Sequence, residues 1–235
     1  NLRDFYFWVG PTAATVHKLF RQGNYEEASC NYTRLAGCCT VMLPVLQRLG
    51  FPLCKELFQE AAYDGNLECM QWLKQNDCPW DEATFTSAVS HSNNDNLLET
   101  LQWLHKNGCP WNEATFSKAA SSSPNNCNGV SIMEWLKYKK CPWNGRVALI
   151  AAAQAGNIES MDWLRANGSP WDWRTFAAAI NAEKLHAAQW LKENGCPWNE
   201  QVFVTAAREG NNLTIMKWLK ENGCPWGART FYYAE

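Results

Sequence analysis

One tripeptide, Cys-Pro-Trp, recurs along this chain of 235 residues and constrains its fold more than any other feature. Five copies match fully, and a sixth carries serine in place of cysteine. The prolines of these copies, with an earlier one, lie at positions 52, 79, 110, 142, 170, 197 and 225, so the basic interval is 27 or 28 residues. Self-similarity at such a period is typical of a stack of small units rather than of a catalytic globule. The sequence therefore predicts a repeat array.

Each unit is predicted to form two short helices. The first follows the tripeptide and begins after Asp or Asn, whose side chain accepts hydrogen bonds from the first helical turn. Its apolar face is spaced i, i+3 and i+4, as in Phe116, Ala119 and Ala120. The second helix starts at a Gly-Asn turn, as at Gly156 and Asn157, and ends at Asn-Gly, where glycine adopts a left-handed conformation. This pattern predicts an all-α solenoid of helix-turn-helix repeats.

Most of the tryptophans occupy two fixed positions of the unit, one in the second helix and one at the end of the tripeptide. We expect both sets to pack between adjacent units, because a buried indole removes roughly 150–250 Å² from water. The side chains predicted to be structural are Trp72, Trp80, Trp103, Trp111, Trp135, Trp143, Trp163, Trp171, Trp190, Trp198, Trp218 and Trp226.

The order of helix, turn, Gly-Asn-Leu-Glu, helix and Asn-Gly, with Ala-Ala in the first helix, resembles the ankyrin repeat. The run Trp-Leu-x-x-Asn-Gly-Cys-Pro-Trp is similar to a variant abundant in proteins of giant viruses and unicellular algae. The resemblance covers roughly residues 25–235 and implies a protein-binding scaffold. The unit here is shorter than about 33 residues, and Cys-Pro-Trp-Asp replaces Thr-Pro-Leu-His. We therefore expect the β-hairpin fingers of the family to be shortened to tight turns.

We divide the chain into four parts. Residues 1–24 form an aromatic N-terminal segment, residues 25–52 a degenerate capping repeat, residues 53–226 six ankyrin-like repeats, and residues 227–235 the first helix of an incomplete repeat. Two interpretations of the aromatic run at residues 5–10 stay open, a hydrophobic lid on the first unit or a docking peptide. Polar insertions at residues 91–95 and 121–129 predict a surface loop between the two helices of a unit.

Composition narrows the class of partner and the compartment. Lys plus Arg number 21 against 23 Asp plus Glu, so the net charge of -2 argues against a nucleic-acid partner. The 11 cysteines are odd in number and one repeat position accepts Ser169, so we expect buried reduced thiols in an intracellular protein. No apolar run approaches the roughly 20 residues that cross a bilayer. We expect a soluble protein.

The side chains that catalysis requires are scattered. The histidines, His17, His91, His105 and His186, share no repeated position, and the cysteines have no zinc-binding spacing. A Gly-rich phosphate loop is absent, because Gly-Asn here joins two helices. We therefore expect no catalytic residue, no metal, no cofactor and no small-molecule substrate.

A first charged surface, the second-helix column, lies in the last turn of the second helices. Cations there either complement the negative end of the helix dipole or form a basic strip that binds phosphate or an acidic protein. The members of the second-helix column are Lys74, His105, Lys137, Arg165, Lys192 and Lys220.

A second surface, the first-helix column, lies opposite the Phe/Ala face of the first helices. It is acidic at the front, small and neutral in a middle that includes Ala153, and basic at the rear. We interpret it as a binding surface for a partner segment whose acidic part lies at the rear; the alternative is ordinary solvated helix surface. The candidate partner-binding residues are Glu56, Glu60, Tyr63, Lys118, Arg146, Arg174, Arg208, Arg229 and Tyr233.

The sequence therefore predicts a non-catalytic scaffold for protein–protein interaction, acting as a structural or adaptor subunit of a larger intracellular assembly. The alternative function is binding of an anionic ligand or nucleic acid along a Lys/Arg column. A steep loss of affinity with salt would favour that alternative.

Overall fold

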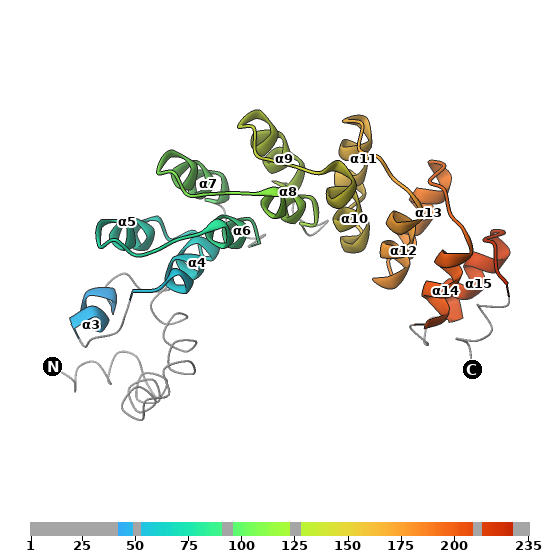
Figure 1. The fold of residues 1–235 in the computed structure, drawn as a ribbon, viewed down its shortest axis with the longest axis horizontal. Coiled ribbons are helices and arrows are strands. Elements are labelled where there is room, and N and C mark those ends of the chain that lie inside the picture. The colour runs from blue at the N-terminus through green and yellow to red at the C-terminus, as the bar shows by residue number, and fades with distance from the viewer. Residues whose placement is uncertain (1–41, 49–52, 91–95, 123–127, 209–212, 228–235) are drawn as a thin grey trace, which may run out of the picture. The chain divides into compact units, whose positions relative to one another are not determined.

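A computed structural model describes residues 42–48, 53–90, 96–122, 128–208 and 213–227. Every regular element in these ranges is a helix, as the sequence predicts, and the protein is an all-α helical repeat array (Figure 1). The helices are α3 (Met42–Arg48), α4 (Lys55–Tyr63), α5 (Leu67–Gln75), α6 (Glu82–Ser90), α7 (Leu97–Lys106), α8 (Glu113–Ala120), α9 (Asn128–Tyr138), α10 (Gly145–Ala155), α11 (Ile158–Ala166), α12 (Trp173–Asn181), α13 (Leu185–Glu193), α14 (Glu200–Arg208) and α15 (Leu213–Glu221).

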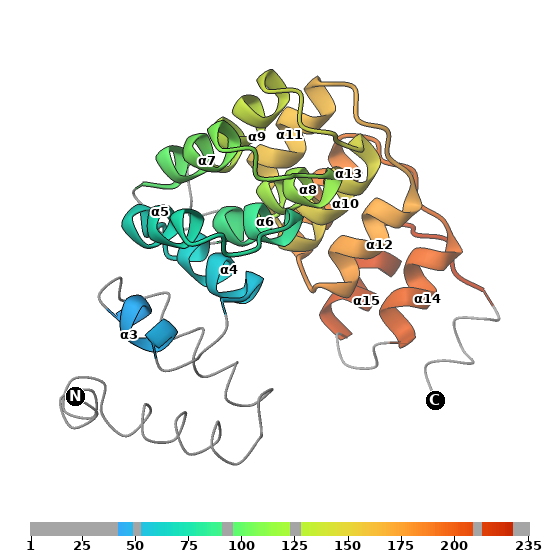
Figure 2. The ribbon, with the colours of Figure 1, turned by 60° about the vertical axis from the view of Figure 1, so that its left-hand side comes forward.

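The chain divides into two compact units, residues 1–111 and residues 112–235. In the first unit, α4 pairs with α5 and α6 with α7, and the first helices α4 and α6 pack against each other. In the second unit, the first helices α8, α10, α12 and α14 pack against one another in that order, and each also packs against its own second helix. Figure 2 shows α4 beside α6 and α12 beside α14 from another direction.

The predicted start of the first helices is confirmed. The Asn144 side-chain oxygen accepts hydrogen bonds from the backbone N–H groups of Arg146 at 3.1 Å and Val147 at 3.3 Å. These bonds satisfy donors that the first helical turn leaves without a partner. The equivalent side chains that accept from the N–H two residues later are Asp81, Asn112, Asp172 and Asn199.

The predicted Gly-Asn turn begins α5 and α11, whereas α13 begins after Glu183 and Lys184. Gly156 adopts φ of 75°, and the following Asn157 accepts a hydrogen bond from the backbone N–H of Ser160 at 3.0 Å. At the other end, four second helices are followed by glycine in the left-handed region, where a Cβ is disfavoured. These glycines are Gly108, Gly168, Gly195 and Gly223. Asp77 and Lys140 replace that glycine in two repeats, with φ of 55° and 62°.

An asparagine before the left-handed residue caps the C-terminus of the second helix. In α11, Asn167 Nδ2 donates to the backbone carbonyl of Trp163 at 2.7 Å. Such a bond satisfies one of the carbonyls that the end of a helix leaves without an intrahelical donor. The same contact is made by Asn76, Asn107, Asn194 and Asn222. After α9, the position of this asparagine is occupied by Lys139.

The apolar face of the first helices forms the core, as predicted. Phe116 and Phe176 are fully buried, and so are the alanines three residues after them. Alanine lets neighbouring first helices approach closely, because its side chain occupies little volume. One assignment is wrong: Ala153, placed in the exposed first-helix column, is fully buried because α10 is packed by α8, α11 and α12.

Consecutive repeats are joined by a recurring aromatic triad. It consists of a Phe from a first helix, the Trp of the tripeptide that follows the same repeat, and the second-helix Trp of the next repeat. In the second unit the ring centroids of Phe116 and Trp143 are 5.1 Å apart, and each is within 6.4 Å of Trp163. The other triads are Phe176, Trp198 and Trp218, and Phe58, Trp80 and Trp103.

The tryptophans are not fully enclosed by these contacts. Eleven of the twelve predicted structural tryptophans are half-buried, and Trp226 is 50% exposed. Trp171 contacts Trp190 at a centroid distance of 6.0 Å, which again joins two repeats. The rings between repeats are therefore partly buried and partly open to solvent.

A thiol hydrogen bond also joins the two ends of each repeat. Cys196 Sγ lies 3.5 Å from the carbonyl oxygen of Asp172, the cap residue of α12, and donates to it. Cys78, Cys109, Cys141 and Cys224 make the same contact with the cap of the preceding first helix at 3.2 to 3.8 Å. Ser169 is the exception, because its shorter side chain leaves a buried hydroxyl without a partner among the described residues.

The predictions for residues 1–24 and for residues 228–235 lie outside the described residues. Of the capping repeat predicted at residues 25–52, the structure describes α3 alone. The four-part division of the chain stays a prediction.

Removing one triad ring tests the role of the aromatic contact. Phe176→Ala is expected to lower the free energy of unfolding by about 3 kcal/mol or more, because a fully buried ring leaves a cavity. Trp226→Ala, at a half-exposed ring, is expected to cost less than half of that. Urea unfolding followed by circular dichroism measures both, and equal losses would contradict the assigned role.

The serine exception provides a matched pair of variants. Ser169→Cys is expected to raise the free energy of unfolding by about 1 kcal/mol, because a thiol replaces an unsatisfied hydroxyl. Gly145, whose missing Cβ would lie 2.7 Å from Ser169 Oγ, leaves room for the sulfur. Cys196→Ser is expected to cost about the same amount. If Ser169→Cys lowers the free energy of unfolding in the same denaturation assay, the space around Ser169 Oγ is too small for a sulfur atom.

Candidate functional site

The acidic front of the first-helix column lies on α4 in the first compact unit. Glu56 is exposed, Glu60 is half-buried, and Tyr63 is 40% exposed. Sequence reasoning missed Lys55, which precedes them on the same helix. Its Nζ donates to Asp81 Oδ2 at 2.9 Å and, mainly through this hydrogen bond, lowers the pKa of the Asp81 carboxyl. The front is therefore less acidic than the sequence alone suggests.

The basic rear lies in the second compact unit. Four successive first helices each contribute one exposed cation, Lys118 from α8, Arg146 from α10, Arg174 from α12 and Arg208 from α14. We call these four residues the basic row. Because these helices pack side by side, the basic row runs across the repeats. Arg229 and Tyr233 lie outside the described residues.

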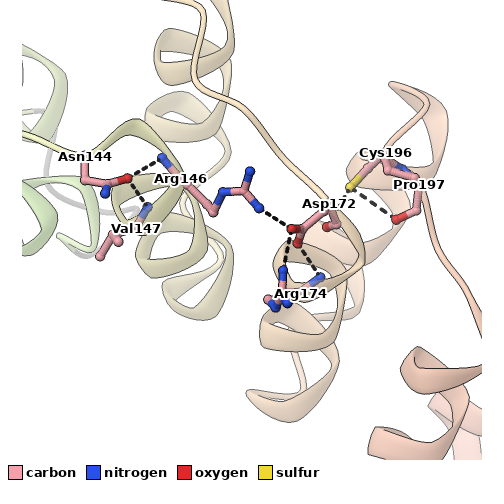
Figure 3. A network of polar contacts seen from close by, with 7 residues as sticks. All are labelled: Asn144, Arg146, Val147, Asp172, Arg174, Cys196 and Pro197. Atoms are coloured by element: carbon pink, nitrogen blue, oxygen red, sulfur yellow. Dashed lines mark hydrogen bonds and ion pairs between the residues drawn. The ribbon is translucent and has the colours of Figure 1, made fainter.

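Two arginines of the basic row converge on one carboxylate (Figure 3). Asp172 Oδ2 accepts a hydrogen bond from Arg174 Nη1 at 2.9 Å and another from Arg146 Nη1. Asp172 Oδ1 meanwhile accepts from the backbone N–H of Arg174 at 2.8 Å, so this carboxylate also caps α12. Asp172 thus orients guanidinium groups from two neighbouring repeats.

The guanidinium groups keep most of their donors for other ligands. The side chains of Arg146 and Arg174 are 44% and 58% exposed, and each uses one nitrogen on Asp172. A guanidinium carries five N–H donors. Helices α10 and α12 contain no acidic residue. Among the described residues, the carboxylate that pairs with these two guanidinium groups is that of Asp172, the N-cap residue of α12. The centre of the basic row therefore keeps a net positive charge.

The second-helix column lies over the tripeptide tryptophans. Arg165 Cζ is 3.7 Å from the Trp171 ring centroid, and Lys74 Nζ is 3.9 Å from the Trp80 centroid. A cation over an indole face is attracted by the ring quadrupole. The rest of the second-helix column repeats this arrangement with the tryptophan that follows six residues later, at Lys137, Lys192, Lys220 and, as a stacked ring, His105.

Two members of the second-helix column also reach the next repeat. Lys137 Nζ donates to Asn167 Oδ1 at 2.5 Å, and Lys192 Nζ donates to Asn222 Oδ1. These asparagines are the helix caps described above. The second-helix column therefore has a packing role, in which its cations hold rings and turns of adjacent repeats together.

The described cysteines are free thiols in apolar surroundings. Burial raises the pKa of Cys109, Cys141 and Cys196 to about 12 and that of Cys224 to about 11. A thiol is a nucleophile or metal ligand only as the thiolate. At neutral pH these side chains are therefore protonated hydrogen-bond donors.

Within the described ranges, no group of three or more His, Cys, Asp or Glu side chains is arranged to hold a metal ion. The described helices also include none with the length and apolar content needed to cross a membrane.

No protein-family model matches the chain, and no curated protein matches it. Solved structures show where its fold occurs. The pentatricopeptide repeat protein PPR10, in complex with an 18-nt psaJ RNA element, aligns with a TM-score of 0.51 and 14% identity over 94% of this chain. A cysteine-to-serine variant of PPR10 with the same RNA gives the same values, and PPR10 from maize gives 15% identity and a TM-score of 0.48.

The likeness to PPR10 supports a helical repeat fold. Each alignment covers 35% of PPR10, so this chain spans about a third of its length. Neither the ankyrin family nor the tryptophan-rich signature is singled out by these structures.

The prediction that a nucleic-acid partner is unlikely is wrong. It rested on the net charge of -2, whereas a protein with this type of fold was solved bound to RNA. Net charge averages over the whole chain, but a ligand responds to the local field. The basic row is one such local surface, which the average conceals.

Sequence reasoning also missed the turn after α9. There Tyr138 is 78% exposed and is followed by Lys139 and Lys140, where the other repeats have Asn-Gly or Asn-Asp. The signal was present in the sequence as a departure from the repeat pattern.

The raised thiol pKa values predict loss of stability in alkali. Up to about pH 8 the thiols are protonated in both states; at higher pH the unfolded chain releases protons that the folded chain keeps until about pH 12. The free energy of unfolding should therefore fall by up to about 1.4 kcal/mol per pH unit for each such thiol.

Urea midpoints measured between about pH 7.5 and pH 10.5 test this expectation, the pH limits being set about 1.5 units either side of the ordinary thiol pKa of 9.0. Lysines and tyrosines titrate in the same range, so the control is a Cys109→Ala, Cys141→Ala variant. Its stability should fall less steeply with pH than that of the natural chain. Parallel slopes would mean that the thiols ionise equally in both states.

Proposed function

We propose that this chain is a non-catalytic scaffold whose basic row binds an acidic segment of a partner protein. The observation that carries this proposal is that four packed first helices each have one exposed cation on the same face. An extended partner lying across the helices would meet one cation per repeat. Arg146 and Arg174 occupy equivalent positions in neighbouring repeats, two residues after the helix cap, whereas Lys118 and Arg208 lie further along their helices.

The Asp172 network supports a carboxylate as the recognised group. Two guanidinium groups already share one carboxylate there, which supports a carboxylate as a ligand for this pair. Arginine binds carboxylates through paired N–H donors, and the exposed donors of Arg146 and Arg174 stay available. Aspartate and glutamate of a partner are therefore the side chains that the centre of the basic row fits best.

We also propose that the repeats are of the ankyrin type, shortened between units. Support comes from the Gly-Asn turn at Gly156 and Asn157, from the paired nine-residue helices such as α4 with α5, and from Asn-Gly at the helix ends. The chain would then act as an adaptor or as a permanent subunit, and stoichiometric co-purification distinguishes the permanent subunit.

A second candidate function is binding of an anionic polymer, including nucleic acid. It is favoured by the RNA-bound structures of PPR10, which has a similar fold, together with the basic row. Phosphates and carboxylates both attract guanidinium groups. The two candidates differ in salt dependence, because each neutralised phosphate of a single strand releases bound counterions.

Neutralising the basic row tests the first candidate. A Lys118→Ala, Arg146→Ala, Arg174→Ala, Arg208→Ala variant, used as bait in native affinity purification, should recover at most about one tenth of each acidic partner. That loss corresponds to about 1.4 kcal/mol of binding free energy. Its thermal midpoint should change little, because exposed ion pairs contribute roughly 0–1 kcal/mol to stability.

The control removes exposed cations that belong to neither column, through Arg48→Ala, Lys106→Ala and Lys217→Ala. It should retain the acidic partners. Equal recovery with both variants would reject the basic row as the binding surface. An Asp172→Asn variant keeps the helix cap but removes the internal carboxylate, and it should bind acidic partners more tightly.

A further inference from the structure

The turn that follows α9 departs from the repeat pattern at two consecutive positions. Asparagine precedes the left-handed residue in the turns after α5, α7, α11, α13 and α15, and its amide caps the helix. After α9, Lys139 occupies the asparagine position and has no amide to donate. Lys140 occupies the next position, where four repeats have glycine, and adopts φ of 62°.

Both changes work against stability. A residue with a Cβ is disfavoured at positive φ, and lysine lacks the short polar side chain with which Asp77 tolerates it. The favourable interaction of cations with the helix C-terminus is already available from Lys137, which lies in the last turn of α9. Stability therefore gives no reason for Lys139 and Lys140.

The same turn carries the most exposed large apolar side chain among the described residues. Tyr138 is 78% exposed, and Lys139 Nζ lies 5.2 Å from its ring centroid. Within the described part of the chain, neither Lys139 nor Lys140 forms an ion pair with a carboxylate. Glu134, on the same helix, accepts a hydrogen bond from Trp163 Nε1. The turn therefore presents an aromatic ring and two uncompensated cations to solvent.

We propose that Tyr138, Lys139 and Lys140 form a contact site for single-stranded nucleic acid. A base stacks on the Tyr138 ring, and the two ammonium groups bind the adjacent phosphates. A flexible single strand offers a planar base and a phosphate in each nucleotide, which matches a ring flanked by cations. An acidic peptide would use the lysines but gain little from the ring, so the exposed tyrosine favours the nucleic acid.

This inference rests on the second candidate function, anionic-polymer binding, and gives it a position in the fold. Lys137 is not included, because its ammonium group is held by Asn167 and lies near the rings of Trp143 and Trp163. The contact site thus consists of residues that packing between repeats does not use.

Fluorescence anisotropy of the full chain with a labelled oligouridine of about 12 nucleotides tests the proposal. Reverting the turn to the repeat pattern, with Lys139→Asn and Lys140→Gly, should weaken binding about tenfold or more. The slope of log affinity against log salt should become shallower by about 1.4, for two lost phosphate contacts. The reverted chain should melt at the same or a higher temperature, so the loss of binding would not reflect unfolding.

The tyrosine is tested separately. Tyr138→Ala should weaken oligouridine binding about tenfold, since stacking of one base contributes roughly that much, and Tyr138→Phe should restore it. The matched charge control is Lys106→Gln with Lys217→Gln, two exposed lysines on other helices, which should leave the affinity within about twofold, as expected of two charges remote from the contact.

The outcomes separate the proposal from the candidate function on which it rests. Oligouridine binding that survives both the reverted turn and Tyr138→Ala overturns this site but leaves anionic-polymer binding in place. Failure of the natural chain to bind oligouridine overturns both. Binding of a polyglutamate peptide that depends on Lys139 and Lys140 but not on Tyr138, without oligouridine binding, would reassign the turn to an acidic protein.

Discussion

The contact between aromatic rings of consecutive repeats is the interaction on which the rest of the structure depends. A two-helix unit cannot bury its own apolar face, so its first helix needs contacts from the next repeat. In the second compact unit, Phe116 and Phe176 each meet two tryptophans in this way, one of them from the next repeat. The helix caps and the thiol hydrogen bonds fix the geometry within each repeat, and Lys137 and Lys192 add contacts to the next one.

Because many side chains take part in packing of the repeats, surface charges need a different interpretation. The lysines and arginines of the second-helix column look like a binding surface in the sequence, yet they pack over tryptophans and reach the asparagine caps of the next repeat. A cation at a regular repeat position therefore has a structural explanation. Cations that depart from the pattern, such as Lys139 and Lys140, lack one, and so they carry more information about function than the regular ones.

The accuracy of the sequence predictions followed the range of the interactions involved. The caps at Asn144 and Asp172 and the left-handed Gly168 were predicted because they depend on residues within one turn of the chain. The buried Phe116 face was predicted because helical spacing alone places it on one side. The burial of Ala153 was missed, since helical spacing says nothing about how many neighbours surround α10. The argument from net charge against a nucleic-acid partner failed because it ignored where the charged side chains lie on the surface.

The sequence by itself determined that this protein is a stack of paired helices, where each helix begins and ends, and which face of each first helix is apolar. These properties are local and repeat with the period of the chain. Only the tertiary structure decided that Arg146 and Arg174 share Asp172, that the second-helix cations lie over tryptophan rings, and that Tyr138 is left in solvent. These contacts join residues from different turns or repeats, and their distances depend on how adjacent helices pack.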